Sequence, residues 1–360
     1  MADVLRMLFG PIRLVEYDRF VARGGAGGQL VNKHFIGGST PWAAAVVVVT
    51  LCAARCGFAA PILSAGEIVI ATQSNGNLYR MHPSTGAVAL VSSGGLLVNP
   101  SHVLIDPLGR ILTAERTGFG GAIVRVDPAT GAQQHVSFMT FPIALDFDLG
   151  GNLVVANRDR DVVRVNPTTG AQTPITQFTQ VQSMQDVDVD TLGRIVGLDA
   201  GFFNSGGGKV VRYDPVTQQT TTVATGGMLF NPADLVIAPD GAFLVSNRLV
   251  GSSTQLLRID PITGAQQLLM TIPSEGFIAM ESPSTLVYAD FYNGPTRRLN
   301  LTNNQSSIIS SSTLAGNEVG VDVFVPEPTF AALGVPALGA LALRRRRPSA
   351  TLRRATDAAL

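Results

Sequence analysis

The chain has 360 residues, of which 46% are hydrophobic and 38 are glycine, so it can bury a large core. Its formal net charge is zero, but the stretch 61–328 holds 13 Arg and one Lys against 22 Asp and Glu, a net charge of −8. Nucleic-acid binding requires clustered Lys and Arg against the phosphates. An acidic body with a single lysine therefore argues against nucleic acid as a partner.

The N-terminal 60 residues predict an export signal. Lys33 and His34 precede the apolar run Trp42–Cys52, and a segment of small residues follows. This order is typical of a secretory signal peptide, here residues 42–60, with cleavage expected between Ala59 and Ala60. A membrane anchor is the alternative, but the run is shorter than the roughly 20 residues that a bilayer core requires. The role of residues 1–41, an N-terminal extension, is left open.

The middle of the chain repeats itself. One series of segments begins with arginine and continues into an Asp-Pro-x-Thr-Gly turn or a variant of it, in which Asp caps amides, Pro fixes φ and Gly adopts a left-handed conformation. The arginines are separated by 45, 39, 48, 46 and 40 residues. The six copies are RMHPSTGAV (80–88), RVDPATGAQ (125–133), RVNPTTGAQ (164–172), RYDPVTQQT (212–220), RIDPITGAQ (258–266) and RLNLTNNQS (298–306).

A second series of alternating segments lies between these copies, for example HVLIDPLGRILTAER (102–116) and DLVIAPDGAFLVSNR (234–248). Each unit thus predicts two hairpins, and four short strands every 40-odd residues are typical of a propeller blade. Segment 67–92 supplies only three strands, whereas 318–325 is a single strand without a partner. Pairing the two closes the ring and removes exposed sheet edges. The sequence therefore predicts an all-β fold, a six-bladed β-propeller over residues 61–325 in which the two ends share a blade.

The repeats resemble those of the six-bladed NHL and SMP-30/gluconolactonase group and, more loosely, of the virginiamycin B lyase propellers. In SMP-30-like enzymes a metal is held by Glu, Asn and Asp side chains near the channel mouth. The resemblance implies Asp234 and Glu318 as ligands, with Asn231 and Asn99 nearby, and Ca²⁺ or another divalent cation as the cofactor.

One column of residues breaks the repeat at the start of each innermost strand. If the ring has six blades, this column surrounds one mouth of the channel and supplies one imidazole and three carboxylates. Asp186, Asp234 and Glu318 could bind a divalent cation, with His102 as a general base. Alternatively, Asp186 belongs to an alternating strand edge and His102 is a solvated loop residue. The column consists of His102, Ala144, Asp186, Asp234, Phe277 and Glu318.

Another column recurs in every blade at the end of the second strand. Its oxygen-bearing side chains are of the kind that calcium binds, but each recurs with the arginine of the next strand, which favours a repeated turn or ion-pair brace. Aromatic residues that could contact a ligand are Phe202, Phe203, Phe291 and Tyr292. The column consists of Thr72, Glu115, Asn157, Asp199, Asn247 and Asp290.

The C-terminal end carries a second address. Pro326, Glu327 and Pro328 precede an uncharged apolar stretch, 329–343, which predicts a transmembrane helix and is followed by Arg344, Arg345, Arg346 and Arg347. This order, over residues 326–347, resembles the PEP-CTERM sorting signal of Gram-negative bacteria. The resemblance implies transient anchoring in the inner membrane, cutting by an exosortase-like membrane protease and release to the cell surface or extracellular matrix. Residues 348–360 would form a cytoplasmic tail. An ordinary tail anchor explains the apolar stretch and the arginines but not the motif.

These patterns favour an exported, non-catalytic binding or structural module, with exopolysaccharide or surface proteins as its partners. The alternative is a divalent-metal-dependent lactonase- or lyase-like enzyme that uses the mouth residues and His102.

Overall fold

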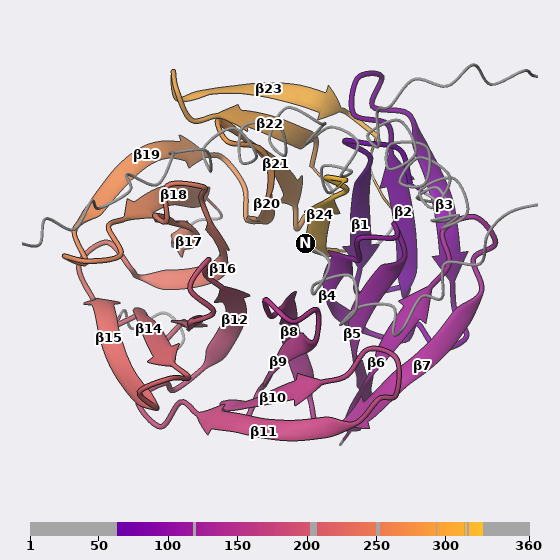
Figure 1. The fold of residues 1–360 in the computed structure, drawn as a ribbon. Helices are drawn as coiled ribbons and strands as arrows, with labels where there is room; N and C mark the ends of the chain where they lie inside the picture. Colours follow the sequence, from indigo (N-terminus) through magenta and orange to yellow (C-terminus); the bar gives the residue numbers. More distant parts are fainter. Residues whose placement is uncertain are drawn as a thin grey trace, which may run out of the picture. The chain divides into compact units, whose positions relative to one another are not determined.

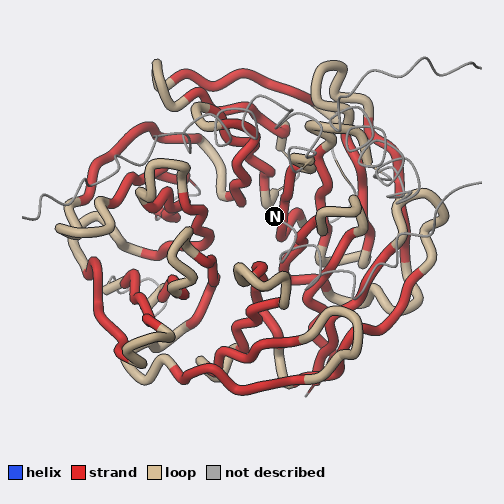
Figure 2. Tube along the Cα trace, viewed as in Figure 1, coloured by secondary structure: helices blue, strands red, loops and turns tan. Residues whose placement is uncertain are grey.

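The repeat of about 40 residues folds as a four-stranded antiparallel sheet. The computed structural model describes residues 63–117, 120–201, 207–249, 253–292, 294–312, 314 and 317–326, within a unit that runs from Ala59 to Leu360. The described residues form strands and turns and contain no helix (Figure 2). Six sheets, called blades I to VI below, stand around a common axis (Figure 1).

Five blades use four consecutive strands, and the first strand of each lies nearest the axis. Blade II comprises β4 (Pro100–Ile105), β5 (Ile111–Thr117), β6 (Gly120–Val126) and β7 (Gln133–Met139). Blade III comprises β8 (Pro142–Phe147), β9 (Leu153–Asn157), β10 (Asp161–Val165) and β11 (Gln172–Gln177). Blade IV comprises β12 (Met184–Val189), β13 (Ile195–Asp199), β14 (Lys209–Asp214) and β15 (Gln219–Thr225). Blade V comprises β16 (Asn231–Ile237), β17 (Phe243–Leu249), β18 (Ser253–Ile259) and β19 (Gln266–Ile272). Blade VI comprises β20 (Gly276–Ser282), β21 (Thr285–Asp290), β22 (Thr296–Asn300) and β23 (Gln305–Ser310).

Blade I joins the two ends of the ring. It comprises β24 (Glu318–Val323), β1 (Ile68–Thr72), β2 (Asn77–Met81) and β3 (Val88–Ser93). The last strand pairs antiparallel with the first, with Val321 opposite Ile70 and Val323 opposite Ile68. The prediction of a six-bladed propeller closed by its own ends is therefore confirmed, and every blade has both of its faces against a neighbour.

The second turn of each blade depends on a left-handed residue. In blade II the Asp127 carboxylate accepts hydrogen bonds from the amides of Ala129 and Thr130, at 2.8 and 3.0 Å, and Gly131 has a φ of 70°. In blade V the equivalent Gly264 also lets the chains approach closely, because a Cβ there would lie 2.1 Å from a carbonyl oxygen of blade IV. Where the repeat lacks glycine, Gln218 adopts the same conformation at a φ of 57°.

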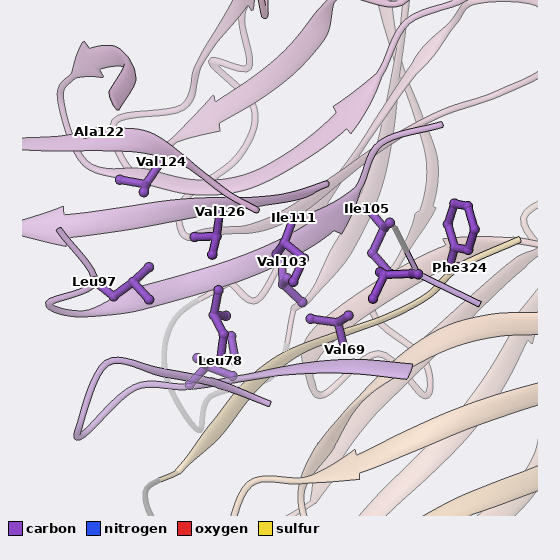
Figure 3. Packing of buried hydrophobic residues seen from close by; sticks show 13 residues of the cluster. Val69, Leu78, Leu97, Val103, Ile105, Ile111, Ala122, Val124, Val126 and Phe324 are labelled. Atoms are coloured by element: carbon purple, nitrogen blue, oxygen red, sulfur yellow. The ribbon is translucent and has the colours of Figure 1, made fainter. Parts of the chain in front are cut away.

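The core is divided into six clusters, one between each pair of neighbouring blades. Figure 3 shows the cluster between blades I and II, where Val69 and Leu78 pack against Val103 and Ile111. Because the second strand of a blade contributes to clusters on both faces, it reads as a continuous apolar run such as LVVAN in β9, in which all five residues are buried. Burial between blades therefore holds the ring together.

Repeated side chains reinforce the contacts between blades. The arginine that begins the first repeat series reaches the carbonyl of the turn proline in the next blade: Arg125 Nη2 donates to Pro167 at 2.5 Å and Arg212 Nη1 to Pro261 at 2.9 Å. Arg298 of blade VI donates to Pro83 of blade I at 3.0 Å. The same contact thus also spans the junction between the two ends of the ring.

Candidate functional site

Strand register identifies the residues that lie at equivalent positions on the innermost strands. His102 stands opposite Ala114, Asp186 opposite Leu198 and Asp234 opposite Ser246. These three partners directly precede residues of the second column, namely Glu115, Asp199 and Asn247. The three side chains therefore lie at the same level around the axis, on β4, β12 and β16.

The structure brings His102, Asp186 and Asp234 together. One ligand atom from each lies within 4.8 Å of the others, and His102 Nε2 is 3.6 Å from Asp186 Oδ1. The histidine is in blade II and the aspartates are in blades IV and V. The equivalent residue of blade III is Ala144, whose methyl group leaves the space that His102 needs to approach Asp186.

The group is buried, and burial sets its charge. Asp186 and Asp234 are 2% and 5% exposed. Burial raises the pKa of Asp234 to about 6, and burial together with the Asp234 charge raises the pKa of Asp186 well above its usual value. Burial lowers the pKa of His102 to about 4. Near neutral pH the imidazole of His102 is therefore neutral.

The carboxylates also have a structural task. Asp186 Oδ2 accepts a hydrogen bond from the Leu235 amide at 2.8 Å, and Asp234 Oδ2 accepts one from the Ile278 amide at 2.6 Å. An innermost strand has a neighbour on one side only, so its remaining amides need acceptors from elsewhere. Each carboxylate provides such an acceptor for the next blade, and one oxygen of each is thereby engaged.

A second layer of carboxylates repeats this arrangement deeper along the axis. The layer consists of Asp146, Asp188 and Asp322. Burial raises the pKa of all three side chains, to about 7 for Asp322. The contacts in this layer are Val189 N to Asp146 Oδ2 at 2.8 Å, Ile237 N to Asp188 Oδ2 at 2.7 Å and Ile105 N to Asp322 Oδ2 at 2.7 Å. Capping of innermost strands by carboxylates is thus a general feature of this ring.

Glu318 lies outside the group of three. It pairs with Thr72, and a β-bulge separates it from Gly320, which stands opposite Ala71 and is the residue equivalent to His102. The side chain is fully buried, and neither carboxylate oxygen has a hydrogen-bond partner among the described residues. Burial, with a further contribution from the Asp290 charge, raises its pKa to about 8. Glu318, which was expected to join His102, Asp186 and Asp234, is therefore a buried side chain outside their group and is neutral near pH 7.

A cavity of about 370 Å³ opens at the end of the ring where the innermost strands begin. We call it the mouth cavity. Residues from all six blades line it, including the neighbours in sequence of His102, Asp186 and Asp234. The lining residues are Gln73, Ser101, Arg116, Ile143, Arg158, Ser183, Met184, Gln185, Ala233, Arg248, Phe277, Phe291 and Val319.

Three arginines of this lining are not among the site residues that the sequence predicts. Arg116, Arg158 and Arg248 directly follow Glu115, Asn157 and Asn247 in the segments AER, ANR and SNR. The signal was present as a repeated arginine one residue after the second column. Arginine at the end of a strand is usually solvated, so this recurrence does not by itself indicate a site.

Three residues of the second column brace the chain. Glu115 Oε2 accepts hydrogen bonds from the amides of Val98 and Asn99, at 2.9 and 3.0 Å. Asp199 and Asn247 hold the corresponding segments of their blades in the same way. The structure therefore favours the architectural interpretation of this column.

Of the two alternatives for that column, a repeated turn or an ion-pair brace, the ion pair with a column residue is absent at the two arginines Arg164 and Arg298. Arg164 Nε lies 2.7 Å from Asp148, not beside Asn157, and Arg298 pairs with Glu281, not Asp290. The acidic partners belong to or adjoin the first hairpin turn, at the opposite end of the second strand.

Aromatic residues form one wall of the mouth cavity. The rings of Phe277 and Phe291 are 6.5 Å apart, and Tyr292 packs edge-on against Phe291 at 5.0 Å. Phe202 and Phe203, also considered as ligand contacts, lie outside the described residues.

The two address signals fall almost entirely outside the described residues. This applies to Ala59 and Ala60, to Glu327 and Pro328, and to 344–347, whereas Pro326 is the last residue described. The part of the chain that is described contains no helix long and apolar enough to cross a membrane.

Comparisons with known proteins support the fold. No protein family matches the chain, and no curated protein sequence matches it. Among solved structures, a chain of a nidogen/laminin complex is similar with a TM-score of 0.59 at 11% identity, over 73% of this chain and 100% of that chain. Putative 6-phosphogluconolactonases from Bacteroides uniformis and Bacteroides fragilis are similar with TM-scores of 0.52 and 0.51, both at 14% identity. They cover 73% and 72% of this chain and 100% and 98% of their own. The chain is a six-bladed β-propeller, and at such identities these neighbours indicate fold alone.

Proposed function

We propose that this chain is an exported, non-catalytic binding module that takes its ligand in the mouth cavity. The observation that carries the proposal is the cavity itself, about 370 Å³ in volume and lined from all six blades by arginine, glutamine and aromatic side chains. Concave sites with a few convergent polar groups are typical ligand sites. Because the lining sits at the ends of packed strands, it is held rigidly before a ligand arrives.

The residues beneath the cavity favour binding over catalysis. Asp186 and Asp234 each accept a hydrogen bond from an amide of the next blade. His102 has a side chain that is 20% exposed. A general base must reach the proton that it removes. Only a small part of His102 is accessible, and the two aspartates hold amides of the next blade. This arrangement favours a structural role for the three residues.

The sorting proposal is compatible with a ligand site at this end of the ring. β24 begins at the mouth end and finishes at Val323, so Pro326 leaves the ring at the opposite end. If the PEP-CTERM-like signal holds the protein in the inner membrane before an exosortase-like protease cuts it, the mouth cavity points away from the membrane. Exopolysaccharide or surface proteins could then reach it.

Thermal unfolding of the purified full-length chain tests the binding proposal. A ligand that binds only the native state raises Tm by mass action, so a panel of acidic and neutral sugars should contain compounds that raise it. In Gln185→Trp the new indole fills the cavity, and we expect the rise to be lost. If every rise persists in this variant, the ligand binds elsewhere and the proposal fails.

A metal-dependent lactonase or lyase is the second candidate, supported by the grouping of His102, Asp186 and Asp234. Each aspartate keeps one oxygen that no amide of the next blade uses, and His102 Nδ1 is buried without a partner. Such a set of three donors fits a transition-metal ion better than Ca²⁺, which takes six to eight oxygen ligands. A bound ion would polarise a lactone carbonyl. Glu318 is not part of this group.

The same unfolding experiment separates the candidates. After treatment with EDTA, Ca²⁺, Mg²⁺ or Mn²⁺ is added to the chain and to a His102→Ala, Asp234→Ala double variant. The binding proposal predicts no ion-dependent rise in Tm. A rise that the double variant abolishes, together with ion-dependent lactone hydrolysis, would establish the enzyme instead.

The sorting proposal has its own test. Cells that produce the chain, or a variant with Arg344–Arg347 replaced by serine, are fractionated into membrane and medium. Loss of membrane retention in the variant is expected, and unchanged retention and release contradicts the proposal.

A further inference from the structure

Two of the mouth arginines come from neighbouring blades and share one cavity. Arg116 lies at the end of β5 in blade II, and Arg158 follows β9 in blade III. Both line the mouth cavity. Arg116 directly follows the brace residue Glu115, and Arg158 directly follows Asn157, the last residue of β9, so the strand ends fix where each guanidinium side chain starts.

Neither guanidinium has a partner among the described residues. No salt bridge and no side-chain hydrogen bond joins Arg116 or Arg158 to another described residue, and Arg116 Nε is buried without an acceptor. Other arginines are paired: Arg110 with Asp106, Arg194 with Asp190 and Arg164 with Asp148. In a body with a net charge of −8, carboxylates are plentiful, yet none of the described ones forms an ion pair with these two side chains.

The two charges also act on each other. Burial and the Arg158 charge both lower the pKa of Arg116, and the Glu115 charge offsets part of this effect. Glu115, the nearest carboxylate in sequence, uses its oxygens to hold Val98, Asn99 and Thr113. Like charges that converge without an intervening anion repel each other, and an anion between them removes that cost.

We propose that Arg116 and Arg158 together bind the oxyanion of a small polyhydroxylated ligand, an acidic sugar that carries a carboxylate or a phosphate. This inference rests on the proposed function and adds the chemical class of the ligand. Planar guanidinium groups match carboxylate and phosphate oxygens with paired hydrogen bonds.

The remainder of the cavity suits the rest of such a ligand. Gln73 and Gln185 offer amide groups to hydroxyls, and Phe277 and Phe291 supply an apolar wall for a sugar face. Arg248, on blade V, is partly neutralised because its Nε lies 3.8 Å from Glu275. The anion is therefore expected on the side of blades II and III.

Isothermal titration calorimetry of the purified full-length chain tests this inference. The probes are galacturonate, glucose 6-phosphate and inorganic phosphate, with galactose and glucose as neutral counterparts. We expect an acidic sugar to bind at least about tenfold more tightly than its neutral counterpart, in line with a charge-assisted pair of hydrogen bonds. Preference for galacturonate identifies a carboxylate ligand, and preference for glucose 6-phosphate identifies a phosphate ligand.

Matched variants locate the effect. Arg116→Gln and Arg158→Gln should each weaken binding of the acidic sugar by about tenfold or more. Arg164→Gln removes the same charge from the opposite end of blade III and should leave binding unchanged. Arg158 is exposed, so its substitution tests the site even if Arg116→Gln impairs folding.

Two outcomes overturn the inference in different ways. If neutral sugars bind as tightly as acidic ones and Gln185→Trp abolishes that binding, the mouth cavity binds ligands but the arginine pair does not select an anion. If no probe binds at about 1 mM, or if binding survives both the arginine substitutions and Gln185→Trp, the inference fails, and in the second case the proposed function fails with it.

Discussion

His102 Nε2 lies 3.6 Å from Asp186 Oδ1, although the two residues belong to blades II and IV. Ala144 of the intervening blade stands at the equivalent position and is too small to separate them. The contact therefore depends on three innermost strands at once, and its charge state depends on burial within the ring.

His102 is expected to remain neutral across the physiological range. Burial lowers its pKa to about 4, below the ordinary value of 6.5, so the native state takes up its proton later than the unfolded chain does. As the pH falls from 6.5 towards 4, this difference lowers the free energy of unfolding. In NMR spectra the C2 proton of His102, assigned by its absence in His102→Gln, should keep its shift between about pH 5.5 and pH 8. A midpoint near or above pH 6 would show that the site is not desolvated as described.

Glu318→Gln should stabilise the protein in a pH-dependent way. The pKa of Glu318 rises from 4.5 to about 8 in the folded chain, so the native state resists its ionisation and stability falls as the pH rises through this window. Glutamine has no such cost. We expect the Tm of the variant to equal that of the parent near pH 4.5 and to exceed it by roughly 3–6 °C above pH 8. An equal difference at both pH values would refute a titrating Glu318.

Glu115 tests the brace at the end of the second strand. Glu115→Ala removes the acceptor that the amides of Val98 and Asn99 share, which should lower the free energy of unfolding by about 2–3 kcal/mol. Glu115→Gln keeps an acceptor oxygen, as Asn247 does naturally in blade V, and should lose less than about 1 kcal/mol. Urea unfolding measures both, and equal losses in the two variants would argue against the brace.

Ring closure can be tested by truncation. A chain that ends at Asn317 lacks β24, and β1 then loses the partner that covers its edge. Such an edge invites association, so we expect oligomers in size-exclusion chromatography and loss of a single cooperative unfolding transition. A chain that ends at Pro326 keeps the strand and serves as the control. A monomeric, cooperatively folded chain ending at Asn317 would mean that closure contributes little.

The architecture could be predicted because its signals are local and repeated. The turn sequence around Asp127 and the alternation of short strands recur with every blade, and the unmatched segments at the two ends left one way to complete the ring. Even where glycine is missing, as at Gln218, the surrounding repeat imposes the same turn conformation.

The site was predicted only in part, because it depends on register and on contacts between blades. Gly320, not Glu318, stands at the position of His102, because Glu318 lies before the β-bulge whereas His102 and Asp186 lie after the equivalent bulge of their own blades. A bulge leaves no clear mark in a single sequence. Arg164 follows Asn157 closely in the chain, but the hairpin brings Asp148 to its side chain. The sequence does not predict that Arg116 and Arg158 share a cavity, because this depends on how blades II and III pack against each other.

A crystal structure of the protein grown with a saturating acidic sugar tests the central claim most directly. The account predicts electron density for the ligand in the mouth cavity, with its oxyanion between Arg116 and Arg158 and its ring near Phe291. An empty mouth cavity at a saturating concentration, or a metal ion held by His102, Asp186 and Asp234 with the ligand bound to it, would contradict the account.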